Sequence, residues 1–396
     1  MRRLLPPVMA VAAALFVAAC GSKPAATAPS GAPAVAVLAP TLATSGSSGS
    51  GASWAIVDMG GAASAYDNFW ELFVRAADSP TWHLATPTGV ASNGGLVAAA
   101  TGATSLVTGF RPSQKLTFSP LASTTDAGMQ WSQSALLSPG LGDGPDALAG
   151  NASGQLIALT DTGDVETSTS LGANWAKLTT ERSLAASAAG RACGLQALAG
   201  AGWTPAGSPL VAGSCSKPGM AGIFAYSAGT WQLIGPALPA ALSGAAVSVL
   251  GLATTVSTAT TGARTTAILA ATTRAGTSVL AAWSADGGTD WQLSPALAAG
   301  RASSPSVSIW ADGSAGVVLA PASRRTGAMI GWQAASWQTL PTLPAGTATL
   351  AIGSGGEPQA LTVRNATMTA WQLSAGSSQW TLVQAVQVTI PYGSSG

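Results

Sequence analysis

The chain has 396 residues, of which only 8% are charged, and its formal net charge is +1 at pH 7. This balance argues against nucleic acid as a partner, because nucleic-acid binding normally requires a strongly basic face. Beyond the first segment no apolar run approaches the roughly 18 residues that a membrane-spanning helix needs, so we expect a soluble body.

The first element in chain order is a predicted secretory signal. Arg2 and Arg3 precede a short apolar stretch, which ends in small residues directly before Cys20. The run Val17–Cys20 resembles the lipobox of bacterial lipoproteins, in which the cysteine sulfur is acylated. The resemblance implies a lipid anchor at Cys20 on the extracytoplasmic face of the cell membrane. Several acyl chains would hold the protein firmly on that membrane. A plain leader with an incidental cysteine is the alternative.

Residues 21–52 are rich in Ala, Pro, Ser and Gly and have no pattern that could form a core. We expect a flexible linker there, followed by one folded body over residues 53–396.

Tryptophans recur in this body about 50 residues apart, at Trp82, Trp131, Trp175, Trp231, Trp291, Trp337 and Trp380. A fixed period of this size indicates a repeat architecture, in which each unit buries its hydrophobic face against its neighbours. Short β-type runs separated by Gly, Pro, Ser and Asp fill each period, which predicts four small antiparallel strands per repeat. The sequence therefore predicts an all-β fold, a seven-bladed β-propeller of four-stranded blades. A solenoid is the structural alternative.

The first repeat lacks one strand, since Trp54–Met59, Phe69–Arg75 and Trp82–Ala85 supply only three. The apolar run Val386–Ile390 follows the last repeat. We expect this run to become the inner strand of the first blade and close the ring, unless it extends the last outer strand.

Turns before two of the tryptophans share the pattern S/T-x-D-x-G-x-x-W, with Thr124, Asp126, Gly128 and Trp131 in one and Ser284, Asp286, Gly288 and Trp291 in the other. This pattern resembles the Asp-box, or bacterial neuraminidase repeat, of sialidase-like propellers. The aspartate can accept backbone N–H bonds, the glycine can take a positive φ, and the tryptophan can pack between sheets. We expect Asp126 and Asp286 to form turns and not to act as catalytic acids.

Cys193 and Cys215 are the cysteines of the body, and in an exported protein such a pair is expected to form a disulfide. Strands over Cys193–Ala199 and Leu210–Cys215 would place the two cysteines opposite each other.

Basic side chains follow the second predicted strand in several repeats, at Arg111, Lys217, Arg274, Arg324, Arg325 and Arg364. Connections expected to open to the same face carry Arg301, Asp143, Asp146, Glu181 and Arg182. In a propeller this face lies opposite the Asp-box turns. A set of arginines there can hold carboxylates or phosphates by paired hydrogen bonds. The alternative is that scarce charges stand at loop ends for solubility.

The run Gly109-Phe110-Arg111-Pro112 is similar to the early Phe/Tyr-Arg-x-Pro motif of sialidases. That family uses an arginine triad, a tyrosine nucleophile paired with a glutamate, and an aspartate as acid and base. The resemblance makes Arg111, Arg274 and Arg364 candidate carboxylate clamps. Tyr66, Tyr226 and Tyr392 depart from the pattern, because none has a suitable glutamate nearby in the expected blade positions.

Other chemistries find little support in the sequence. His83 is the one histidine and is expected to be a packing or surface residue, and we expect neither a metal site nor a cofactor. The favoured function is a membrane-anchored, monomeric binding or assembly platform. Its basic loop face would engage an anionic glycan, a cell-wall polymer or another envelope protein. A sialidase-like glycoside hydrolase is the alternative, and fold alone cannot separate the two.

Overall fold

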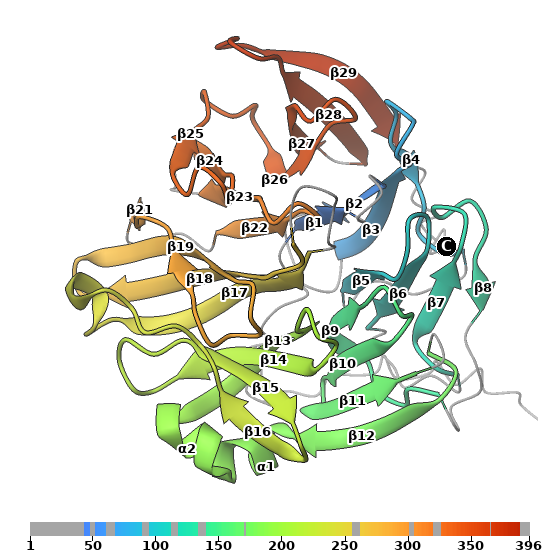
Figure 1. Ribbon diagram of the computed structural model, residues 1–396. Coiled ribbons are helices and arrows are strands. Elements are labelled where there is room, and N and C mark those ends of the chain that lie inside the picture. Colours follow the sequence, from blue (N-terminus) through green and yellow to red (C-terminus); the bar gives the residue numbers. More distant parts are fainter. Residues whose placement is uncertain are drawn as a thin grey trace, which may run out of the picture. The chain divides into compact units, whose positions relative to one another are not determined.

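The computed structural model describes residues 43–47, 52–60, 68–88, 95–111, 118–133, 140–169, 172–255, 262–300, 305–319, 326–364 and 366–388, all within one compact unit. Nearly all regular structure in these residues is β-strand (Figure 1). None of the helices in this described part is long and apolar enough to cross a membrane.

The strands follow one another in groups of four, and each group is an antiparallel meander in chain order. Group 1 holds β1 (Thr44–Ser47), β2 (Ser53–Gly60), β3 (Asn68–Arg75) and β4 (His83–Leu84). Group 2 holds β5 (Leu96–Ala100), β6 (Leu106–Phe110), β7 (Leu121–Thr124) and β8 (Ser132–Gln133). Group 3 holds β9 (Pro145–Gly150), β10 (Leu156–Thr160), β11 (Asp164–Ser168) and β12 (Trp175–Thr180). Group 4 holds β13 (Leu195–Trp203), β14 (Pro209–Cys215), β15 (Gly222–Ser227) and β16 (Thr230–Leu233).

The same order continues to the end of the described chain. Group 5 holds β17 (Ala246–Thr254), β18 (Thr265–Thr273), β19 (Gly276–Ser284) and β20 (Gln292–Leu293), and β21 (Leu297–Gly300) also pairs with β19. Group 6 holds β22 (Ser306–Ile309), β23 (Ala315–Leu319), β24 (Thr326–Ile330) and β25 (Trp337–Thr339). Group 7 holds β26 (Thr347–Ile352), β27 (Pro358–Arg364), β28 (Thr367–Leu373) and β29 (Trp380–Gln387). The helices α1 (Glu181–Ala186) and α2 (Ala188–Cys193) connect groups 3 and 4, and the 3-10 turn η1 (Ala240–Leu242) connects groups 4 and 5.

The recurring tryptophans mark the start of the fourth strand in each group. Trp175, Trp337 and Trp380 are the first residues of their strands, and the other four lie within one residue of a strand start. The predicted mostly-β, four-strand repeat is therefore confirmed, and the tryptophan period sets its register.

Apolar side chains between neighbouring groups form the core. One cluster joins groups 1 and 2 through Ile56 and Phe110, and corresponding clusters join each later group to the next. A further cluster joins group 7 to group 1 through Leu361 and Phe73. The order of packing is therefore circular. The hydrogen bonds do not close a ring: groups 1 and 6 share one sheet, groups 4 and 5 share another, and groups 2, 3 and 7 each form a sheet of their own.

The first strand of group 1 differs from the prediction. It is β1, which lies inside the segment expected to be linker, and it pairs antiparallel with β2 and parallel with β22. Its Ser45 is buried, and Thr44 Oγ1 donates to the Val307 carbonyl at 3.0 Å. The expectation that Val386–Ile390 would supply this strand is wrong. Val386 instead pairs with Met368 and extends the outer strand β29 along β28, which was the alternative.

Side chains also tie group 7 to group 1. The Gln384 amide accepts from the Trp82 backbone N–H at 2.7 Å and donates to the Trp82 carbonyl at 2.8 Å. The indole of Trp82 donates to Gln359 Oε1 at 3.0 Å. Arg75 reaches across and donates to the Ile352 carbonyl at 2.9 Å. Polar and apolar contacts therefore join the same two groups.

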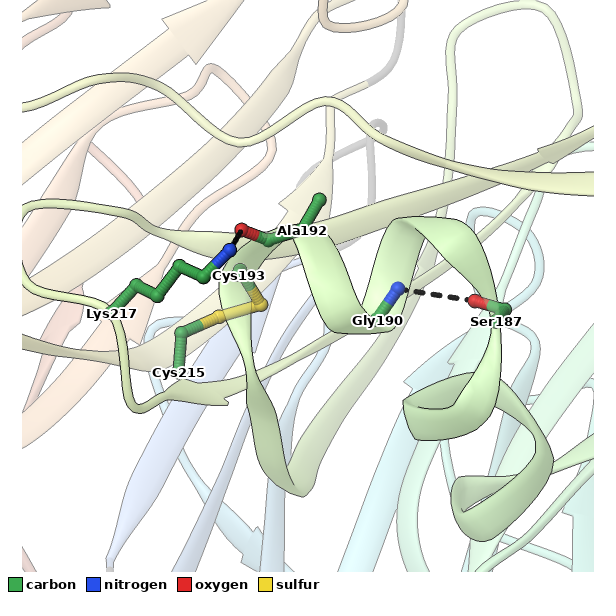
Figure 2. Close-up of a disulfide and its surroundings, with 6 residues drawn as sticks. All are labelled: Ser187, Gly190, Ala192, Cys193, Cys215 and Lys217. Atoms are coloured by element: carbon green, nitrogen blue, oxygen red, sulfur yellow. Dashed lines mark hydrogen bonds between the residues drawn. A yellow bond between two sulfur atoms is a disulfide. The ribbon is translucent and has the colours of Figure 1, made fainter.

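The predicted disulfide between Cys193 and Cys215 is present, with the Cα atoms 5.4 Å apart (Figure 2). The predicted strand register around it is wrong by two residues. Cys193 ends α2, and it is Leu195 that pairs with Cys215 across β13 and β14. Gly194 ends the helix with a left-handed φ of 68°, which a glycine adopts at little cost. The disulfide therefore joins a helix end to a strand end.

Candidate functional site

Each group has two ends, because alternate turns of an antiparallel meander lie at opposite ends of its strands. We call the end with the second-to-third connections the connection end. The connections from a fourth strand to the next group lie there too. The other is the hairpin end, with the first-to-second and third-to-fourth turns.

The two Asp-box turns lie at the hairpin end, between β7 and β8 and between β19 and β20. Asp126 Oδ1 accepts from the Thr124 hydroxyl at 2.7 Å and from the Gln130 N–H at 2.9 Å. Asp286 Oδ1 accepts from the Ser284 hydroxyl at 2.8 Å and from the Asp290 N–H at 3.1 Å. These bonds hold the pKa of both carboxyls below the usual value, the largest effect coming from the hydroxyl at Asp126 and from the Asp290 N–H at Asp286. Both carboxylates are thus engaged in their own turns.

The glycines and tryptophans of the two motifs complete the turns. Gly128 and Gly288 have positive φ values of 86° and 101°. Trp131 packs in the cluster between groups 1 and 2, and Trp291 packs between groups 4 and 5. The Trp291 indole donates to the Ile234 carbonyl at 2.7 Å, which links neighbouring groups.

Described basic residues from the predicted set all follow the second strand of their group, at the connection end. Arg274 and Arg364 are exposed. Lys217 Nζ donates to the Ala192 carbonyl at 2.7 Å (Figure 2). No contact between any two of the described basic residues is observed. Arg301, Arg324 and Arg325, like Cys20, lie outside the described residues.

Arg111 forms an ion pair with Asp146, with Nη1 and Oδ1 2.8 Å apart. Both side chains are mostly buried, at 14% and 21% exposed. The pKa of Asp146 is raised to about 6. Burial is the main cause, Arg111 opposes it, and nearby Asp161 and Glu181 add to the rise. The pair therefore brings a base from group 2 to an acid from group 3.

A cavity of about 490 Å³ lies beside this pair, and we call it the central cavity. First strands from six groups line it, through residues such as Thr44, Leu96, Ala199 and Val307, and most of the lining is apolar and small. Asp146 is its one charged lining residue among those described. The sequence had placed Asp146 on this face as a residue that could complete a pocket.

Larger cavities lie at the hairpin end. One of about 840 Å³ is lined by Arg75, Asp312, Trp310 and several serines, and we call it the Arg75 cavity. Another of about 920 Å³ is lined mainly by the first-to-second turns of five groups. Ser47 and Ala311 line both cavities, so the two adjoin.

Sequence reasoning did not single out the two buried arginines of the hairpin end. Arg75 and Arg264 are only 1% and 8% exposed. The available signal was the position of Arg75 at the end of an apolar run in a predicted strand. His83 lies in β4, and its Nε2 is 3.1 Å from the Ala127 carbonyl oxygen, which is a packing role.

The described residues contain no group of three or more His, Cys, Asp or Glu side chains arranged to hold a metal ion. Tyr226 stacks against Trp231 across β15 and β16, with ring centroids 5.2 Å apart. Tyr66 and Tyr392 lie outside the described residues.

No protein-family model matches the chain, and no curated protein matches it. Solved structures do. A GH74 xyloglucanase from Xanthomonas campestris has a TM-score of 0.52 and 14% identity, over 87% of this chain and 54% of that one. A putative 6-phosphogluconolactonase from Bacteroides uniformis has a TM-score of 0.51 and 10% identity, over 85% and 96%. YCF48 bound to D1 peptide has a TM-score of 0.44 and 17% identity, over 82% and 92%. The first two, with TM-scores above 0.5, are β-propellers, and the chain shares their mostly-β propeller-type fold.

Proposed function

We propose that the strand groups are the blades of a closed, seven-bladed β-propeller. The circular order of the core clusters supports closure, because the last group packs against the first through Leu361 and Phe73. Asp-box turns at the hairpin end support a place among sialidase-like propellers.

The function that we propose is a binding or assembly platform without catalytic activity. It is held at the extracytoplasmic face of the cell membrane by acylation of Cys20. The observation that carries this proposal is the central cavity, which has an apolar lining and Asp146, the ion-pair partner of Arg111, at its wall. An apolar pocket with a few polar groups is the usual form of a binding site. Exposed Arg274 and Arg364 at the same end supply positive charge that would attract an anionic partner.

The expected partners are an anionic glycan, a cell-wall polymer or another envelope protein. The test measures binding of polygalacturonate and of purified wall teichoic acid to the full-length chain. Changing both Arg274 and Arg364 to alanine should weaken binding several-fold and flatten its salt dependence. Lys177→Ala, in the outer strand β12, is the control. Equal loss in the control, or no loss in the double variant, contradicts a basic binding face.

Membrane attachment is tested separately. Cys20→Ser should release the protein from the membrane fraction and abolish incorporation of labelled palmitate. Retention of either property argues against lipidation at this residue.

A sialidase-like glycoside hydrolase is the second candidate, and one observation favours it. Asp146 is a buried carboxyl with a pKa raised to about 6, which suits a general acid, and it lies beside Arg111. Hydrolysis of a fluorogenic sialoside that disappears in Asp146→Asn would favour the enzyme. Absence of turnover with intact binding of the polyanions would favour the platform.

A further inference from the structure

The Arg75 cavity lies at the hairpin end, away from the site proposed above. Residues from the first group and from the last two groups meet there. Ser53 and Arg75 come from group 1, Asp312 from group 6 and Ser354 from group 7. Its volume of about 840 Å³ falls in the range of ordinary small-molecule sites.

The guanidinium of Arg75 is buried, lies 5.7 Å from the centre of the Trp82 ring, and donates its hydrogen bonds to neutral acceptors. Nη2 donates to Ser53 Oγ and to the Ile352 carbonyl, both at 2.9 Å, and Nη1 donates to the Ser79 carbonyl at 3.1 Å. Its Nε–H is buried without a partner among the described residues. Burial lowers the pKa of Arg75, and no carboxylate among the described residues offsets this effect. A buried charge without an opposite charge is costly, so the site favours an added anion.

Asp312 has the one carboxylate among the described residues of the cavity wall, and it interacts with another arginine, Arg264. Asp312 raises the pKa of Arg264, which burial otherwise lowers. The Arg264 guanidinium lies 3.2 Å from the centre of the Trp332 ring. Asp312 itself accepts from the Ser314 N–H at 2.9 Å. Asp312 thus interacts electrostatically with Arg264, whereas no described carboxylate shifts the pKa of Arg75.

A second residue of the cavity wall, Trp310, has an unfilled donor. The indole of Trp310 is 3% exposed, and its Nε1–H is buried without a hydrogen-bond partner among the described residues. Two buried donors, one of them charged, require acceptor atoms that the described protein does not provide. A carboxylate offers two such acceptors and suits the fork of an arginine.

We propose that the Arg75 cavity binds the carboxylate of an acidic sugar. The rest of the wall fits a hydroxyl-rich molecule, because Ser336, Gln338 and Ser354 are exposed on it and can both donate and accept hydrogen bonds. Asp312 disfavours a doubly charged phosphate, since like charges in one cavity repel each other. The ligand is therefore a monoanion that carries hydroxyl groups.

The experiment titrates the full-length chain with three probes, D-glucuronate, D-glucose and glucose 6-phosphate, by isothermal calorimetry. Glucuronate should bind at least about 10-fold more tightly than glucose, as one charge-assisted contact would give. Glucose 6-phosphate should bind more weakly than glucuronate. Equal binding of glucose and glucuronate, no binding of glucuronate, or preference for the phosphate would each overturn the assignment.

Substitutions test whether glucuronate binds in the Arg75 cavity. Ser354→Trp fills the cavity from an exposed position and should abolish glucuronate binding, whereas Ser378→Trp, on an exposed turn outside the cavity, should leave it unchanged. Asp312→Asn removes a negative charge and should tighten glucuronate binding several-fold.

Arg75→Gln should weaken binding at least about 10-fold, provided that its circular dichroism spectrum matches the parent. Because Arg75 also bridges two groups, a loss of fold in this variant leaves the decision to Ser354→Trp and Asp312→Asn. Glucuronate binding that survives Ser354→Trp, or that Asp312→Asn leaves unaltered, means that the site is elsewhere.

Discussion

Asp146 offers a direct test of how the connection end is built. Its carboxyl is mostly buried beside Arg111, and burial raises its pKa from 3.8 to about 6. Between about pH 4 and pH 6 the folded protein therefore holds this proton more tightly than the unfolded chain does. The free energy of unfolding should fall as the pH rises through this interval, because ionisation of the buried group opposes folding.

The size of the effect follows from the shift of about 2.2 pH units. At 1.36 kcal/mol per unit, ionisation of Asp146 removes about 3 kcal/mol of stability between about pH 4 and pH 7. Asp146→Asn cannot ionise, so its stability should fall by about 3 kcal/mol less than that of the parent over the same interval.

Urea unfolding at several pH values, followed by tryptophan fluorescence, measures this difference. Asp126→Asn is a useful contrast, because hydrogen bonds lower the pKa of Asp126. Its carboxylate therefore stabilises the fold above about pH 4, and this contribution disappears on acidification. Parallel pH profiles for the parent and Asp146→Asn would refute the burial of this carboxyl.

Three further outcomes are expected. Gln384→Ala should lower the free energy of unfolding by about 1–3 kcal/mol in urea, because it removes two hydrogen bonds between group 7 and group 1. Gln387→Ala, exposed on the same strand, should change it little, and equal effects would contradict the tie. Replacing Cys193 and Cys215 by serine should lower the stability by about 3 kcal/mol, as expected for a loop closed over 22 residues; an unchanged melting temperature would argue against the disulfide. A chain that begins at Ser53 lacks β1 and should melt at a lower temperature than one that begins at Leu38, and identical melting would show that β1 is dispensable.

Much of the fold could be predicted because its signals are local. The tryptophan at the start of each fourth strand, and the turn residues around it, follow from short-range chemistry and repeat along the chain. The predicted strand Phe69–Arg75, for example, matches β3 to within one residue. Fold class and strand order were therefore within reach of the sequence.

Closure of the repeat was not predictable in the same way. The run Val386–Ile390 has the hydrophobicity of a strand, whereas β1 is Thr-Ser-Gly-Ser, which looks like linker. Small polar residues can serve there because the strand is held by backbone pairing on both sides and by hydroxyls such as Ser45. Pairing partners more than 250 residues away leave no local trace.

The candidate site was predicted in part. Arg111 and Asp146 were both assigned to the connection end, yet their ion pair depends on the packing of group 2 against group 3. Arg75 was missed because a charged residue at a strand end usually faces solvent. Its burial depends on Ile352, from the other end of the described chain.

The position of β1 also has a mechanical consequence. A force applied through the N-terminal segment acts on a strand that is bonded to β2 on one side and to β22 on the other. Pulling along this strand loads both rows of hydrogen bonds in shear, so that they must break together. Peeling a strand from the edge of a sheet would break them one at a time. A force from an anchor attached ahead of Thr44 would therefore act on a strand inside the sheet and not on a strand at its edge.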